Sequence, residues 1–130
     1  MSIATTQYQD KDLTLFTWQG TVTLTDFMTA TDENLRAPAS LEIADLRNTA
    51  AIDITYQDLQ QIRQTIQAAL NRGVYPPGKS AVVVDKPDLL TMVEIFSAFA
   101  DIWGIDREYR IFSDMAAACR WLDLPPSFIT

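Results

Sequence analysis

The sequence predicts a single α/β domain over residues 1–130, with helices on both faces of a mostly parallel sheet. Segments with the two-residue period of strands alternate along the chain with segments that have the period of helices. The connections are so short that consecutive elements must be neighbours, and right-handed crossovers then make the sheet mostly parallel. A composition of 48% hydrophobic and 21% charged residues is typical of one globular core.

Five segments are predicted strands because they are apolar and rich in β-branched or aromatic residues. Residues 3–8 can pair with residues 13–18 across a polar turn, and Gly20 is expected to end the second of these strands. Residues 81–84 are apolar without alternation, as in a central strand covered on both faces. The predicted strands are residues 3–8, 13–18, 41–46, 81–84 and 109–112.

Capping residues and stop signals predict two helices in the first half of the chain. A short helix is expected to begin at Thr25 or Asp26 and to end before Pro38. Thr55 is a good N-cap for a longer amphipathic helix. The sequence Asn-Arg-Gly at residues 71–73 is the stop signal of that helix.

Two further helices are predicted in the second half. Asp85 is expected to cap a helix over residues 88–103, and Ser113 or Asp114 a final helix through Leu122. The tail after the two prolines at 125 and 126 is expected to be loosely held.

The residue types needed for common catalytic sites are missing from the sequence. It contains no histidine, which removes Ser-His and Cys-His nucleophiles and most zinc sites. We expect the lone Cys119 to be buried filler. Residues 73–80 match the Gly-x4-Gly-Lys-Ser phosphate loop, but this match leaves a helix and enters a strand, and its two prolines lack backbone donors. We therefore predict a plain turn there, no cofactor and no enzymatic activity.

Charge and chain patterning exclude several partners. The 10 basic and 17 acidic residues give a formal charge of −7, which repels nucleic acid and anionic lipid headgroups. We find no N-terminal targeting pattern and no apolar run long enough to span a bilayer, so we predict no transmembrane segment. A single cysteine fits a reducing compartment, and we predict a cytoplasmic location.

Three aspartates lie near the carboxyl ends of predicted parallel strands, where open α/β sheets bind ligands. Asp45, Asp85 and Asp114 could together hold Mg²⁺ with a phosphorylated substrate, which would suit a phosphoryl-transfer enzyme. The simpler interpretation is that Asp85 and Asp114 cap the helices that follow them. We favour the caps and predict no metal site.

The helix predicted over residues 88–103 has more apolar surface than one face of a small sheet can cover. Its apolar side chains occupy about half of its circumference. The surplus indicates extra core packing, contact with a partner subunit, an apolar ligand beneath the helix, or a tail folded over it through Phe128 and Ile129. The candidate interface or ligand contacts are Met92, Ile95, Phe96, Phe99 and Trp103.

Several short motifs occur in an order that resembles the SpoIIAA-like branch of the STAS-like domain superfamily. They are Gly-Thr-Val-Thr at 20–23, Ile-Ala-Asp-Leu-Arg at 43–47, the valines at 82–84, Arg-Ile-Phe at 110–112, and Ala118 with Trp121 and Leu122. The resemblance implies four parallel strands in sequential order, built as a β-α superhelix, with an N-terminal antiparallel strand. Some members of the branch are also related to lipid-carrying SEC14-type domains.

The resemblance also implies a regulatory role and a modification site. Domains of the anti-sigma-factor-antagonist kind bind a protein partner, and phosphorylation of a Ser or Thr that opens the second helix switches that binding. Thr55 lies at the phosphoacceptor position, but an N-cap needs no such modification, and we favour the cap as the role of Thr55.

Together these observations predict a non-enzymatic, cytoplasmic binding or regulatory module. We expect it to act through protein-protein contacts, as a homodimer or with another protein, through the helix at residues 88–103. The alternative is a carrier or sensor of an apolar or lipid-like small molecule beneath that helix.

Overall fold

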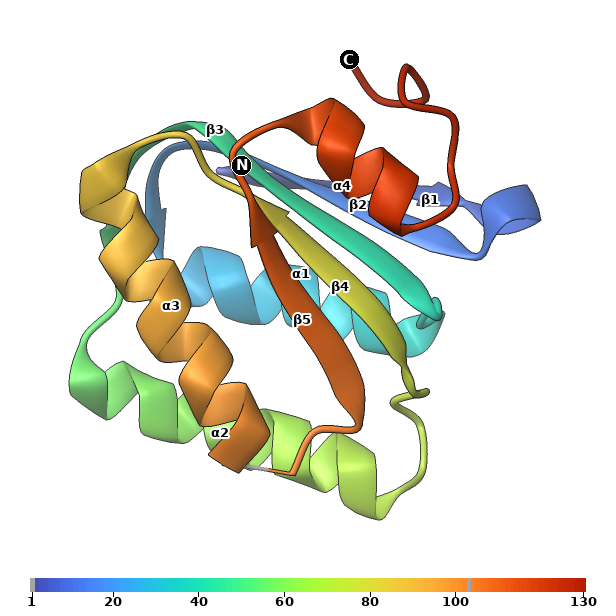
Figure 1. Ribbon diagram of the computed structural model, residues 1–130. Helices are drawn as coiled ribbons and strands as arrows, with labels where there is room; N and C mark the ends of the chain where they lie inside the picture. Colours follow the sequence, from blue (N-terminus) through green and yellow to red (C-terminus); the bar gives the residue numbers. More distant parts are fainter. Residues whose placement is uncertain (1, 103) are drawn as a thin grey trace.

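A computed structural model of the chain describes residues 2–102 and 104–130, which form a five-stranded sheet with three helices on one face and one on the other (Figure 1). The strands lie in the order β1-β2-β3-β4-β5; β1 is antiparallel to β2, and the other pairs are parallel. The strands are β1 (Ile3–Tyr8), β2 (Leu13–Thr23), β3 (Leu41–Asp53), β4 (Gly78–Val83) and β5 (Arg107–Phe112). The helices are α1 (Leu24–Arg36), α2 (Tyr56–Asn71), α3 (Pro87–Ile102) and α4 (Met115–Trp121). The predicted α/β architecture, with helices on both faces, is confirmed.

One face of the sheet is covered by α4 and the segment that follows it. Met115, Ala118 and Cys119 of α4 pack on inward side chains of β2, β3 and β4, including Leu15 and Ile43. Cys119 is fully buried, as expected of filler.

The C-terminal tail also packs on the α4 face, so the prediction of a loosely held tail is wrong. Phe128 and Ile129 pack against the cluster under α4. The Phe128 ring lies edge-on to Tyr8 of β1 at 5.1 Å, and the Arg47 guanidinium donates to the Thr130 carbonyl at 3.1 Å. The tail therefore does not cover α3, because its aromatic anchor lies on the opposite face of the sheet.

The other face is covered by α1 and α3, with α2 packed against both helices (Figure 1). Leu89 and Val93 of α3 join Ala30 of α1 in one buried cluster over the sheet. The apolar stripe of α2 forms a second cluster with Ala100 of α3 and with half-buried residues of α1.

The β2 strand continues beyond the predicted stop at Gly20. Its pairing with β3 shifts register between Thr17 and Gln19 and again between Gly20 and Thr21. Gly20 has a φ of +62°, a conformation that glycine adopts at little cost and that is common at bulges. The bulges let both strands run on to Thr23 and Asp53, so the prediction that Gly20 ends the strand is wrong.

Short polar side chains cap three of the helices. Thr23, and not Thr25 or Asp26, caps α1, and Asp26 is the reciprocal partner in its capping box. Thr55 and Asp114 cap α2 and α4, as predicted. Asp85 does not cap α3, because the carbonyl of Lys86 accepts the first bonds of that helix, from Leu89 and Leu90.

The segment that matches a phosphate loop is a helix-to-strand turn, as predicted. It leaves α2 at Gly73, which has a φ of +69°, and enters β4 at Gly78. A Cβ atom on Gly78 would lie 1.8 Å from the Ser40 carbonyl oxygen, so only glycine lets the two backbones approach.

No helix in the described part of the chain is long and apolar enough to cross a membrane.

Candidate functional site

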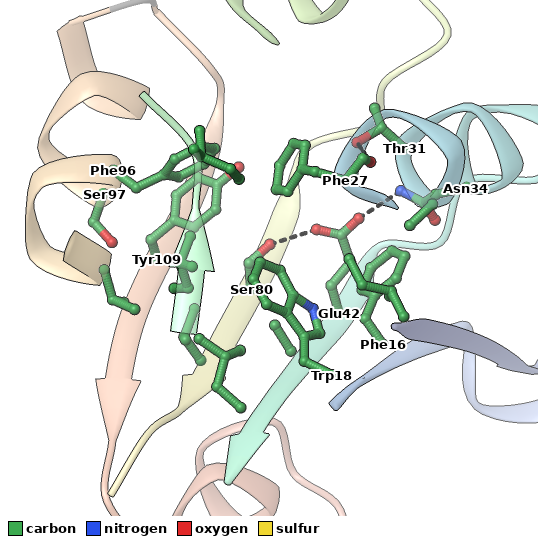
Figure 2. A pocket seen from close by; sticks show the side chains of 18 of the residues that line it. Phe16, Trp18, Phe27, Thr31, Asn34, Glu42, Ser80, Phe96, Ser97 and Tyr109 are labelled. Carbon is green, nitrogen blue, oxygen red and sulfur yellow. Dashed lines mark hydrogen bonds between the residues drawn. The ribbon is translucent and has the colours of Figure 1, made fainter. Parts of the chain in front are cut away.

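A cavity of about 160 Å³ lies between the sheet and the three helices that cover one of its faces. Nearly all of its wall is apolar, and one end carries polar side chains (Figure 2). α1, α3 and the central strands supply most of the lining.

The floor of the cavity is a row of side chains that runs across the central strands. Phe16, Ala44 and Val82 are register partners on β2, β3 and β4, so they point to the same face. A central strand under helices would normally be fully buried, yet all three side chains are only partly buried. Their exposure means that the helices do not close over the floor.

Aromatic rings from the sheet and two helices line the cavity. Trp18 lies edge-on to Phe27 of α1 at a centroid distance of 6.1 Å. Phe27 in turn lies 5.4 Å from Phe96 of α3, with the rings tilted by 57°. Because Phe27 and Phe96 reach toward each other from different helices, this aromatic contact bridges α1 and α3 (Figure 2).

The polar end of the cavity is organised by the buried Glu42, the second residue of β3. Its carboxylate accepts hydrogen bonds from Asn34 Nδ2 and Ser80 Oγ, both at 2.7 Å, from opposite sides (Figure 2). The Tyr75 hydroxyl also donates to Glu42 Oε1, at 3.3 Å. Sheet register brings Glu42 beside Ser80, and Ser80 beside Tyr109 of β5.

Arg107, at the start of β5, does not line the cavity, but its guanidinium balances the charge of Glu42. Its Nε lies 3.5 Å from Glu42 Oε1 and donates to Ser80 Oγ at 3.0 Å, so Ser80 bridges the two charged groups. The other guanidinium donors bond four backbone carbonyls, those of Ala39, Ser40, Pro76 and Lys79. All five donors of the guanidinium are therefore used within the protein.

Two tyrosines next to Glu42 are held in the neutral form. Burial, followed by the charge of Glu42, raises the pKa of Tyr75 well above its usual value. The same two causes raise the pKa of Tyr109 to about 12. Both phenols therefore act as neutral hydrogen-bonding groups at ordinary pH.

Asn34, one of the lining residues, has a buried side-chain oxygen without a hydrogen-bond partner among the described residues. Asn34 is only 4% exposed, and its Nδ2 donates to Glu42. Its Oδ1 accepts no hydrogen bond from any residue within 2–102 and 104–130. A buried acceptor of this kind is uncommon, because leaving it unpaired costs about 1–3 kcal/mol.

The predicted contact residues of α3 are divided between the cavity and the outer surface. Met92 and Phe96 line the cavity. Phe99 packs with α2 residues and lies 6.0 Å from the Tyr56 ring, whereas Ile95 is 44% exposed. Trp103 lies outside the described residues.

Thr55 lies away from the cavity lining, at the exposed N-terminus of α2. Its Oγ1 accepts from the Asp58 amide at 3.1 Å, and its own amide donates to Asp58 Oδ2 at 2.9 Å. This capping box accounts for the threonine, and its role as a phosphoacceptor stays a prediction.

The aspartates at the carboxyl ends of the strands are used separately. Asp45 binds Arg47 through two hydrogen bonds of 2.9 Å, and Asp114 caps α4. Burial alone would raise the pKa of Asp45, but the hydrogen bonds from Arg47 and its charge hold that pKa below its usual value. Within the described ranges, no three acidic or cysteine side chains are grouped as metal ligands.

The polar end of the cavity was not predicted from the sequence. Glu42 carried a signal, because it occupies the same face of its strand as Ala44 and Leu46 and is therefore a charge in an inward position. Asn34 and Arg107 carried no comparable signal. Their partners lie on elements that are distant in the sequence.

Comparisons with known proteins identify the fold. No protein-family model matches the sequence, and no curated protein matches it at a significant level. A similar solved structure is that of an uncharacterised protein of the DUF3478 family, with a SpoIIAA-like fold, from Shewanella loihica PV-4. The TM-score is 0.55 at 16% sequence identity, and the match covers 92% of this chain and 91% of the other. This likeness and the strand order confirm that the chain has a SpoIIAA-like fold.

Proposed function

We propose that this protein is a non-enzymatic binding module that senses or carries a small apolar molecule in the cavity beneath α3. The observation that carries the proposal is the partly exposed apolar floor of Phe16, Ala44 and Val82 in the centre of the sheet. A ligand that covers apolar surface left uncovered by the protein's own helices removes that surface from water, which lowers the free energy and favours binding.

The volume of the cavity favours a ligand of about one ring. An engineered apolar cavity of about 150 Å³ binds benzene, and the cavity here has about 160 Å³. A lipid acyl chain needs several times that volume. We therefore favour a ring-sized molecule over a lipid, although both belong to the apolar class that the sequence predicted.

The polar side chains around the cavity support binding better than catalysis. Glu42, Ser80, Tyr75 and Arg107 are hydrogen-bonded to one another or to backbone groups. Such a network fixes the walls of a pocket, because each side chain is held in one orientation by its partners.

We also propose a cytoplasmic location, consistent with a single, buried cysteine.

The direct test is a titration with fluorobenzene, followed by ¹⁹F NMR and by thermal unfolding. We expect saturable binding, with a stabilisation of about 2.7 kcal/mol when the free ligand reaches about 100 times its Kd. Ala44→Leu places a larger side chain on the cavity floor and should abolish binding. Ala68→Leu, at an exposed position of α2, is the matched control and should bind normally. Absence of saturable binding by the unmodified protein would refute the proposal.

A second candidate function is self-association through the outer edge of α3. Ile102 is 75% exposed and Ile95 is 44% exposed, seven residues apart and therefore on one side of the helix. Tyr56, 68% exposed, adds to this apolar surface from the start of α2. The occupant that we favour is a second copy of the chain.

Sedimentation velocity over a range of protein concentrations tests this second candidate. A dimer should form at high concentration, and Ile102→Asp should shift it toward monomer. Gln61→Asp, at an exposed position of α2, controls for the added charge and should leave the dimer unchanged. A monomer at all concentrations would exclude self-association.

A further inference from the structure

We infer that the cavity selects single-ring hydrocarbons and halogenated hydrocarbons, and that it rejects phenols and other rings that carry a hydrogen-bonding group. Ser80 sets this selectivity, because its hydroxyl already makes the bond to Glu42 that a ligand hydroxyl would otherwise make. This inference rests on the proposed function and names the class of ligand that the cavity takes.

The polar groups at the end of the cavity are bonded to one another. Ser80 Oγ donates to Glu42 Oε1 at 2.7 Å and accepts from Arg107 Nε at 3.0 Å. The same carboxylate accepts from Asn34 Nδ2 at 2.7 Å and from the Tyr75 hydroxyl at 3.3 Å. Together with the Arg107 guanidinium at 3.5 Å, these donors account for the roughly four acceptor sites of a carboxylate.

The other polar atoms of the lining residues offer little to a ligand. Nearly all of the surface that faces the cavity is apolar. The Thr31 hydroxyl donates to the Phe27 carbonyl at 2.9 Å. Asn34 Oδ1 is buried, and it is turned away from Glu42 and from the aromatic side chains (Figure 2).

A hydrogen-bonding group on the ligand would therefore be left unpaired. It would lose its bonds to water on entering the cavity and would gain none from the described residues. A water molecule carried in with the ligand could not replace them, because a buried water needs several polar partners of its own. Leaving one polar group unpaired in a buried site lowers affinity by about tenfold or more.

The position of Ser80 explains why this residue sets the selectivity. Sheet register places Ser80 beside Glu42, and both residues line the cavity. Figure 2 shows their hydrogen bond among the labelled aromatic side chains. A ligand oxygen in the place of Ser80 Oγ would lie 2.7 Å from Glu42 Oε1 and could donate the same bond. The serine hydroxyl thus occupies the place in which a phenol hydroxyl would be bound.

Binding of fluorobenzene and phenol to the unmodified protein tests the selectivity. The two molecules have nearly the same size, and phenol, like the tyrosine side chain, is neutral at pH 7. We expect fluorobenzene to bind about tenfold more tightly than phenol in calorimetry at this pH. Phenol that binds as tightly as fluorobenzene, or more tightly, would overturn the inference.

Two variants test the role of Ser80. Ser80→Ala removes the hydroxyl and leaves Glu42 Oε1 open to a donor on the ligand, so the fluorobenzene-to-phenol affinity ratio should fall from about ten to one or below. Thr31→Val is the matched control, because Thr31 also lines the cavity but its hydroxyl donates to a backbone carbonyl. The ratio should stay near ten in this control.

The outcomes separate the inference from the proposed function. If neither probe binds the unmodified protein, the proposed function fails. If both bind it equally, the cavity takes ring-sized ligands without rejecting a hydroxyl, and the inference fails alone. A ratio near ten in Ser80→Ala would show that Ser80 does not set the selectivity. The ratio in the unmodified protein decides the class of ligand even if Ser80→Ala does not fold.

Discussion

Glu42 is the residue on which the packing of the polar end depends. Its carboxylate is the common acceptor for side chains from α1, β4 and the α2–β4 turn, and it balances the charge of Arg107. A buried ion pair contributes little more to stability than apolar side chains of similar size, but removing one partner leaves the other charge buried and unpaired. The loss of Glu42 would therefore destabilise the protein mainly by leaving the Arg107 guanidinium without a counterion.

Replacing Glu42 should be strongly destabilising for this reason. Glu42→Leu leaves the guanidinium of Arg107, 1% exposed, without its counterion, so we expect the free energy of unfolding to fall by about 3–5 kcal/mol. Urea unfolding at pH 7 measures the change. Asp85→Asn removes a carboxylate that is 48% exposed and pairs with Lys86 at 3.7 Å, and it should change stability by less than about 1 kcal/mol. Similar losses in the two variants would contradict the role of Glu42.

Tyr109 should make the protein sensitive to alkali. Burial, with the nearby Glu42 charge, raises its pKa to about 12, whereas tyrosine in the unfolded chain ionises near pH 10. The unfolded state therefore loses its proton first, and the stability due to this group is complete below pH 10 and is lost as the pH rises to about 12. Urea unfolding at intervals from pH 9 to 12 should show this decline, and Tyr109→Phe should make it shallower. An unchanged profile in that variant would contradict the assignment.

At the scale of elements, the N-termini of the helices are fixed by short local motifs. Thr23 and Thr55 each bond the amide three residues later, and an aspartate at that position bonds back. The aspartate of the first motif has a lowered pKa, because the Thr23 backbone amide donates to its carboxylate. The two boxes fix the residues at which α1 and α2 begin.

The cap at Thr55 can be tested apart from the predicted phosphorylation. Thr55→Ala should lower the free energy of unfolding by about 1 kcal/mol, because the Asp58 amide loses its acceptor, whereas Thr55→Ser should keep most of it. Chemical denaturation measures both variants. Phosphopeptide mapping after incubation with cell lysate and ATP tests the modification itself. If the alanine variant is as stable as the original protein, the capping box does not stabilise α2.

The elements were predictable from the sequence where their signals are local. The N-cap of α2, the stop after Asn71 and the apolar run of β4 all appear in the sequence as short motifs, and the structure has them. The bulges that carry β2 past Gly20 were not predictable, because they depend on pairing with β3. For the same reason the cavity was foreseen only through Met92 and Phe96. Its polar end joins residues such as Asn34 and Arg107, whose partners are set by the tertiary fold.

At the scale of the whole molecule, the two faces of the sheet are packed differently. Under α4, the core residues Leu13, Ile43 and Val83 are at most 1% exposed, and the tail adds a second layer. Under α1 and α3, the equivalent strand residues Ala44 and Val82 are only partly buried. The face under α4 is therefore fully packed and contributes most to stability. The face under α1 and α3 contains a cavity, although filling it with larger side chains would make the protein more stable.

This division predicts that stability and binding oppose each other at Ala44. Ala44→Leu, the variant expected to block binding, should raise the free energy of unfolding of the ligand-free protein by about 1 kcal/mol, because it fills existing space over the floor. Ala69→Leu makes the same change in α2 at a fully buried position outside the described lining, and overpacking should cost it about 1–3 kcal/mol. Chemical denaturation of both variants without ligand measures the difference. A loss of stability in Ala44→Leu as large as that in Ala69→Leu would mean that the floor is as tightly packed as the rest of the core, and that the space above it is too small to hold a ligand.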